Sequence, residues 1–259
     1  MEDGGEIPAA PVKHRKVAAT ITAPFFPQEV SSVSSNGLNL AIEYIKGGKR
    51  GLVVAYTHRS KREGLAMMNL LFNIPELRKV RIVSPVAHHT YSNNPLFDAA
   101  ARFTGIEFLP IVTAETRDLL SKKGQTDPDP RRRSFLEYLY KSVDALKDGA
   151  VLPIALQAAG KQETLGPPTS ALSSLVRIAE KNNVDNFGVL FVGLTYPREK
   201  EQNKKMHGYN PLRKMQLNIG NFYTADQLND IADNNPKNLD PWAFGQLAEL
   251  MPKWYSPPR

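Results

Sequence analysis

Short apolar runs alternate with helical patterns along most of this chain, and this alternation limits the fold more than any other feature. Five runs are short and apolar enough to be buried strands: 51–56, 80–86, 106–112, 150–156 and 187–195. Amphipathic helices are predicted between and around them, over 37–46, 95–103, 131–149 and 170–181. Strands that alternate with helices predict an α/β fold with a mostly parallel central sheet and helices on both faces.

The same order predicts a single domain over residues 35–259. The chain has 259 residues, of which 41% are hydrophobic, so it can bury a sizeable core. We expect residues 1–34 to be irregular, residues 36–197 to form the core, and residues 198–259 to form a C-terminal extension. Within that extension a strand is predicted near 215–219, and helices near 224–232 and 241–250.

The charge balance favours anionic partners. The chain carries 33 Lys and Arg against 26 Asp and Glu, a net charge of +7. Such an excess suits a phospholipid surface, phosphorylated substrates or acidic carrier proteins, or it serves solubility alone. Nucleic acid is not expected, because the chain has no recognisable nucleic-acid-binding motif.

Several other classes of site lack their sequence signals. The absence of cysteine excludes disulfides and thiolate metal sites, and is compatible with a cytoplasmic location. We expect no metal or cofactor, because neither a glycine-rich phosphate loop nor a metal-binding motif occurs. No apolar run reaches the roughly 18–20 residues that span a bilayer, so any membrane contact is expected to be peripheral.

A histidine and an acid follow the first apolar run, in the sequence HRSKRE at positions 58–63. His58 stands at the carboxyl end of a predicted strand, where open α/β sheets carry their chemistry. Glu63 stands near the start of the next helix, and a carboxylate partner would fix the tautomer of the histidine. Two other interpretations remain open. His58 can be an ordinary loop histidine, and Glu63 can complete a capping box with Ser60.

The order and spacing of these motifs resemble the glycerolipid acyltransferases of the PlsC type. Their first motif is His, four residues, then Asp, and the resemblance covers about residues 36–197, from GLVVAYTHRSKREG to GVLFVGLTYP. The acid here is Glu63, as is thought for some related lipid A acyltransferases. The family's Pro-Glu-Gly-Thr-Arg phosphate motif corresponds to QAAGKQ at 157–162, where only Gly160 matches well.

The resemblance implies an acyltransferase with an acyl-CoA or acyl-carrier-protein thioester as donor and a hydroxyl of a lipid-like acceptor. His58 would act as general base and Glu63 would orient it. Amide groups at the start of the following helix, or in the Gly160 loop, would bind the oxyanion. The thioester carries a good leaving group, so no covalent enzyme intermediate and no further cofactor are expected.

The expected substrate-binding residues are Ser60, Lys61, Arg62, His88, Arg102, Gly160 and Lys161. The basic ones would contact phosphates of the donor or the headgroup, and in the family the loop of His88 lines the substrate groove. The basic residues can instead be solvated surface charges, and His88 can belong to a solvated loop. The changed phosphate motif keeps a second function open: a non-catalytic protein of acyltransferase fold that binds lipid or acyl carrier.

Overall fold

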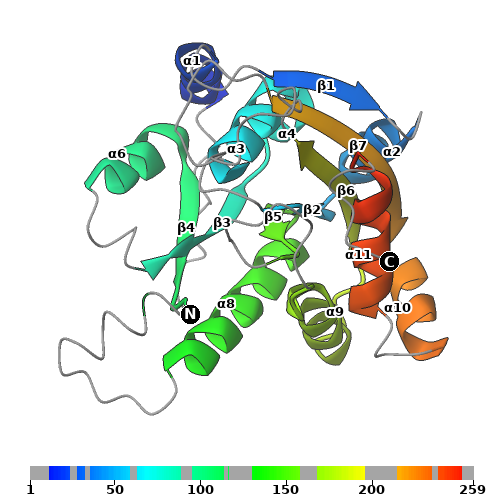
Figure 1. Cartoon of the computed structure of the whole chain (residues 1–259). Helices are drawn as coiled ribbons and strands as arrows, with labels where there is room; N and C mark the ends of the chain where they lie inside the picture. The colour runs from blue at the N-terminus through cyan, green and yellow to red at the C-terminus, as the bar shows by residue number, and fades with distance from the viewer. Residues whose placement is uncertain are drawn as a thin grey trace, which may run out of the picture.

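The computed structural model describes residues 12–23, 28–32, 36–58, 63–88, 95–113, 116, 130–157, 168–195, 215–234 and 239–252. Within them, a seven-stranded sheet forms the centre of the protein (Figure 1). Across the sheet the order is β1 (Gln28–Ser32), β7 (Met215–Thr224), β6 (Phe187–Thr195), β2 (Gly51–Tyr56), β5 (Val151–Ala155), β3 (Ile82–Ala87) and β4 (Ile106–Ile111).

The sheet is mostly parallel, as predicted. Strands β6, β2, β5, β3 and β4 pair in parallel with one another, in that order. Strand β7 pairs antiparallel with β6 and parallel with β1, so the antiparallel step lies near one edge. Each of the parallel neighbours is reached by a helical connection, which is the arrangement that parallel pairing requires.

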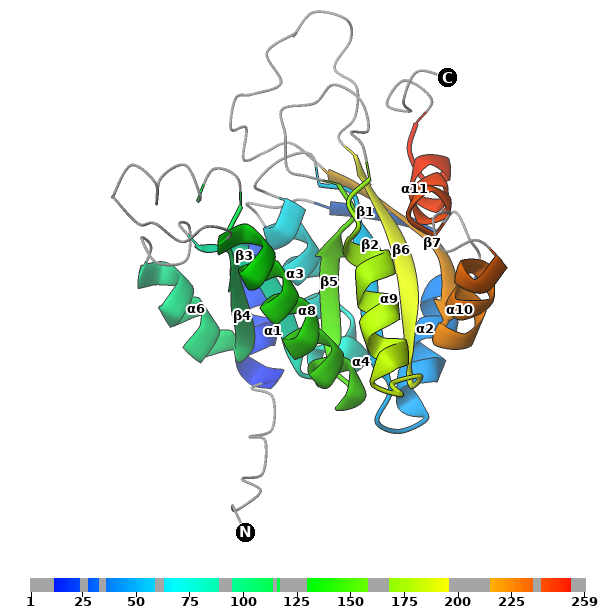
Figure 2. The same ribbon diagram turned by 90° about the horizontal axis from the view of Figure 1, so that it is seen from below.

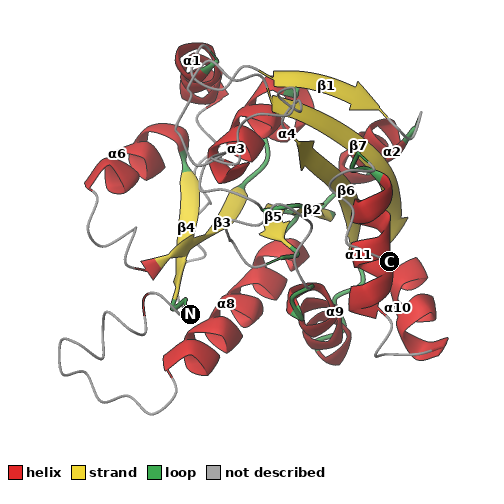
Figure 3. Cartoon of the chain, in the orientation of Figure 1, coloured by secondary structure: helices red, strands yellow, loops and turns green. Residues whose placement is uncertain are grey.

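Helices cover both faces of the sheet, which confirms the predicted α/β class (Figure 3). One face carries α8 (Pro130–Lys147), α9 (Ala171–Lys181), α10 (Ala225–Asn234) and α11 (Leu239–Glu249). The other carries α1 (Val12–Thr22), α2 (Gly37–Lys46), α3 (Glu63–Asn73), α4 (Pro75–Arg78) and α6 (Pro95–Thr104). Figure 2 shows α8 and α9 on the near side of the sheet and α3 on the far side.

Strand β2 shows why the two faces are both apolar. Its residues are all buried, and they alternate between two clusters. Val53 and Ala55 contribute to the cluster under α8 and α9, whereas Leu52, Val54 and Tyr56 contribute to the cluster under α3. Because successive side chains of a strand point to opposite faces, a strand covered on both sides must be apolar throughout.

The expectation that residues 1–34 are irregular is wrong for the described part of that segment, which contains α1 and β1. Helix α1 buries only two side chains, Arg15 and Ala19, so it lacks the apolar stripe that would reveal it in the sequence. Arg15 is fully buried and donates hydrogen bonds to carbonyl oxygens of four residues near the ends of α4 and α6. Tertiary contacts therefore hold this helix in place.

The C-terminal part of the chain contributes directly to the sheet. Strand β7 runs to Thr224, five residues past the predicted end, and lies between β1 and β6. The short helix α4 was not predicted. In the part of the chain that the structure describes, no helix combines the length and apolar character needed to cross a membrane.

Candidate functional site

The carboxyl ends of β2, β5 and β3 meet at one edge of the sheet. Strand β2 ends at Tyr56, which pairs with Ala155 of β5 on one side and with Val192 of β6 on the other. Thr57 and His58 follow directly, so they leave the sheet between two neighbouring strands. Ligands of open parallel sheets bind at such an edge.

His58 and Glu63 form the predicted pair. The Nδ1 atom of His58 lies 3.2 Å from Oε2 of Glu63. The Glu63 side chain is fully buried, whereas that of His58 is 21% exposed. A carboxylate can only accept, so Nδ1 carries the proton in this bond and the neutral ring keeps Nε2 as its acceptor. No described residue hydrogen-bonds Nε2, which leaves this nitrogen for a proton from outside.

Helix α3 explains how a fully buried carboxylate is tolerated at this place. Glu63 is the first residue of α3, where the helix dipole favours negative charge. The adjacent imidazole supplies a hydrogen bond and, when protonated, a counter-charge. The predicted cap by Ser60 falls outside the described residues and stays a prediction.

Tyr56 lies beneath the pair. Its ring is edge-on to that of His58, with the centroids 6.1 Å apart. Its hydroxyl lies 3.9 Å from where a Cβ would stand on Gly64, in the first turn of α3. Burial, and to a lesser extent the negative charge of Glu63, raise the pKa of Tyr56. The phenol therefore stays neutral at physiological pH and adds no charge to the site.

Thr57 fixes the backbone next to the histidine. It is fully buried, and its Oγ1 accepts a hydrogen bond of 2.9 Å from the N–H of Leu194 in β6. The same hydroxyl donates to the carbonyl oxygen of Leu194 at 3.3 Å. A side chain thus continues the contact with β6 just past the last backbone pair of the two strands.

Gln157 makes the corresponding contact from the side of β5. Its Nε2 donates to the backbone carbonyl oxygen of His58 at 2.8 Å. Neither Thr57 nor Gln157 was predicted as a site residue. Thr57 stands one residue before His58, and Gln157 directly follows the fourth predicted strand. Because both strands end at the same edge of the sheet, these positions were the signal available in the sequence.

The structure brings one further predicted residue to this edge and leaves another far away. His88 follows β3 directly and is half-buried, at the same edge as His58 and two strands from β2. Arg102 is exposed in the last turn of α6, just before β4 begins at Ile106.

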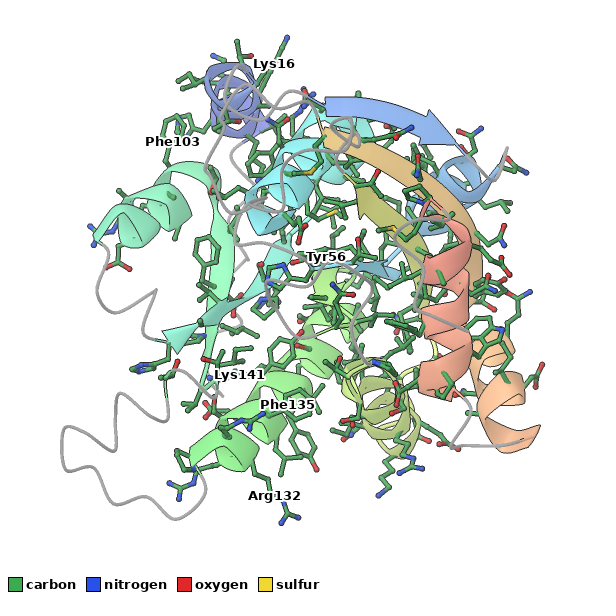
Figure 4. All side chains as sticks on the ribbon, in the orientation of Figure 1. Lys16, Tyr56, Phe103, Arg132, Phe135 and Lys141 are labelled. Carbon is green, nitrogen blue, oxygen red and sulfur yellow. The ribbon has the colours of Figure 1, made fainter. Side chains whose placement is uncertain are left out.

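The distance of Arg102 from the site follows from the strand register. Ile106 and Leu52 lie level across the sheet, through Ile82 and Val151. His58 is six residues beyond Leu52, or about 20 Å along the strand direction. Figure 4 shows Tyr56 near the middle of the fold and Phe103, the neighbour of Arg102, at the periphery beside α1. The structure therefore does not bring Arg102 together with His58.

The remaining predicted substrate residues lie outside the described residues. They are Ser60, Lys61, Arg62, Gly160 and Lys161. The described residues that flank the segment of Gly160 and Lys161 pair with each other. Gln157, before it, forms a β-bridge with Pro168, after it. Roles for these five residues stay predictions.

The arrangement of the site suits a positioned base. A neutral imidazole, held by a buried carboxylate through Nδ1, can take a proton at Nε2 and pass it on. Among the described residues, no group of three or more His, Cys, Asp or Glu side chains is placed to hold a metal ion. His58 and Glu63 supply two such side chains, fewer than the three protein ligands typical of a catalytic zinc site.

Comparisons with known proteins give likenesses in structure but none in sequence. No protein-family model matches the sequence, and no curated protein matches it. The structure is similar to the crystal structure of PlsC from Thermotoga maritima, a 1-acyl-sn-glycerophosphate (LPA) acyltransferase. The two chains are 12% identical, and the likeness covers 89% of this chain and 79% of the other with a TM-score of 0.46. A likeness of this size establishes neither the family nor the activity.

Proposed function

We propose that this protein is an acyltransferase that moves a fatty acyl group from a CoA or acyl-carrier-protein thioester to a hydroxyl of a lipid-like acceptor. One observation carries the proposal: the partly exposed imidazole of His58 is held through Nδ1 by the fully buried carboxylate of Glu63, at the carboxyl edge of a parallel sheet. The order of motifs around this pair, which resembles the PlsC-type acyltransferases, supports the same chemistry.

In the proposed reaction, Nε2 of His58 removes the proton of the acceptor hydroxyl while the hydroxyl oxygen attacks the thioester carbonyl carbon. Positive charge develops on the ring, and Glu63 stabilises it across the 3.2 Å contact. The tetrahedral intermediate then collapses: the C–S bond breaks, and the leaving thiolate takes the proton from the imidazolium. General base catalysis of this kind contributes about 10²–10⁴-fold to the rate.

The oxyanion of the intermediate needs hydrogen-bond donors. Helix α3 begins at Glu63, next to the imidazole, and its backbone N–H groups point toward this end of the helix. We assign these amides as the candidate donors, because the positive end of the helix favours a developing negative charge. No metal ion is needed in this scheme.

The proposal also covers partners and location. Acyl-CoA or acyl-carrier protein is the expected donor, and the net charge of +7 suits the phosphates or acidic side chains of either. A lipid-like acceptor requires access to a membrane surface, so we propose peripheral membrane contact by a cytoplasmic protein.

Release of free thiol from acyl-CoA, in the presence of a panel of lysolipid acceptors, tests the proposal. His58→Ala should lower kcat by at least 100-fold, at the low end of the contribution of a general base. His14→Ala is a matched control, since His14 also hydrogen-bonds through Nδ1, to the carbonyl oxygen of Phe103 on the distant α6. It should retain the wild-type rate.

His58→Ala leaves the buried carboxylate of Glu63 without its imidazole partner, so this variant can lose activity through unfolding alone. A second variant separates the two causes. His58→Gln keeps a hydrogen-bonding side chain of similar reach and should be equally inactive. Equal rates in wild type and a folded His58 variant would overturn the catalytic proposal and favour a lipid- or carrier-binding protein.

A further inference from the structure

Strands β2 and β5 separate at His58, and the backbone ladder between them ends there. The last β5 amide in the ladder is that of Leu156, which donates to the carbonyl oxygen of Tyr56 at 3.1 Å. If the parallel pattern continued, the amide of His58 would donate to the carbonyl of Leu156. That carbonyl instead accepts from the backbone N–H and the hydroxyl of Thr169, at 2.8 and 3.2 Å. The backbone of β5 has thus turned away from His58.

Gln157 takes over the place of the missing ladder bond. In a continued ladder, the carbonyl of His58 would accept from the backbone N–H of position 158. Here the side-chain amide of Gln157 makes this bond, with Nε2 at 2.8 Å from the carbonyl oxygen. The side chain is 2% exposed, and its Oε1 is buried without a hydrogen-bond partner. A buried amide that satisfies one of its two polar atoms is unfavourable for stability.

We propose that Gln157 is a positioning residue for His58. The kinetic part of its test rests on the proposed function. Its amide fixes the carbonyl of His58 from the side of β5, while Thr57 fixes the preceding residue from the side of β6 through Leu194. The backbone of the histidine is thereby held from both neighbouring strands, and Glu63 holds the ring.

Such a restraint matters because proton transfer tolerates only a small displacement of the base. A base must approach its proton within about 2.6–3.2 Å, and a displacement of about 1 Å can lower a rate by about 10²-fold. His58 has left the sheet, so ladder bonds no longer fix its backbone. Gln157 restores one fixed point without returning the chain to the strand, which leaves the ring free to face outward from the edge.

The test replaces Gln157 by Met, which has a similar length and no donor. The matched control is Gln246→Met, because Oε1 of Gln246 accepts a hydrogen bond of 2.7 Å from Tyr223, far from the site. Two quantities are measured for each protein: kcat and KM for acyl-CoA, and the Nδ1–H signal of His58 in long-range ¹H–¹⁵N NMR spectra. The signal is assigned by its loss in His58→Gln.

Gln157→Met should lower kcat by about 10–100-fold with KM within about threefold, and the Nδ1–H signal should shift or broaden. Gln246→Met should leave both unchanged. Should Gln157→Met fail to fold, Gln157→Asn replaces it, since an amide one methylene shorter cannot reach the carbonyl. A folded Gln157 variant with an unchanged His58 signal would overturn the proposal. The NMR result needs no turnover, so it stands even if the protein proves inactive on thioesters.

Discussion

Replacement of Glu63 by Gln isolates the contribution of the carboxylate charge to the site. Glutamine has the same shape, and its amide oxygen can still accept the Nδ1–H bond of His58. The neutral imidazole therefore keeps a partner, but the imidazolium that forms during proton transfer loses its counter-charge. We expect a fall in kcat, because the transition state carries more positive charge on the ring than the ground state does.

The expected magnitude follows from the geometry. Two unit charges 3.2 Å apart interact by about 5 kcal/mol at an effective dielectric constant of about 20. Partial exposure of His58 and its partial charge in the transition state reduce this to roughly half. Since about 1.4 kcal/mol corresponds to a tenfold change, Glu63→Gln should lower kcat by about 10²-fold.

The assay is the initial rate of thiol release from acyl-CoA with an active lysolipid acceptor. Glu107→Gln is the matched control, because Glu107 also pairs with a cation, Arg81, at 2.6 Å, at the far end of β4 from the site. It should show the wild-type rate. A Glu63→Gln protein that folds normally and works within about threefold of wild type would refute the assigned role of the carboxylate.

Three further predictions concern stability. Arg15→Met should lower the free energy of unfolding in urea by about 3 kcal/mol, because four carbonyl groups lose a charged donor. Lys13→Met, exposed on the same helix, should change it by less than about 0.5 kcal/mol, and equal effects would contradict the account of α1. The raised pKa of Tyr56 means that, above pH about 10, the unfolded chain loses a proton that the folded one keeps, so stability falls as pH rises. In Tyr56→Phe this fall should be shallower by up to about 1.4 kcal/mol per pH unit, and equal slopes in alkaline denaturation curves would count against it. Thr57→Val should cost about 1–3 kcal/mol, since both backbone groups of Leu194 lose their partner in the core, and an unchanged melting curve would be evidence against this bond.

The fold class and the central strands could be predicted because their signals are local. A strand covered on both faces must be apolar along its whole length, and β2 and β6 are buried at every position. Helix α2 begins and ends as predicted, because its apolar face and the following glycine pair both lie in the local sequence. The contact between His58 and Glu63 was also predictable, since a strand end and the next helix start are close in space whatever surrounds them.

Other features depend on contacts between distant segments. Strand β1 is a short polar segment, QEVSS, that is a strand because it pairs with β7, nearly 190 residues away along the chain. Helix α1 is held by a buried arginine, a residue that sequence patterns place on the surface.

The sequence alone determined the periodicity of the elements and the residue types at the end of β2, because hydrophobic burial and helix geometry act over a few residues. Only the tertiary structure decided that Arg102 lies at the opposite edge of the sheet and that Gln157 reaches His58. Strand order and register set these distances, and they result from packing of the whole chain rather than from any local pattern.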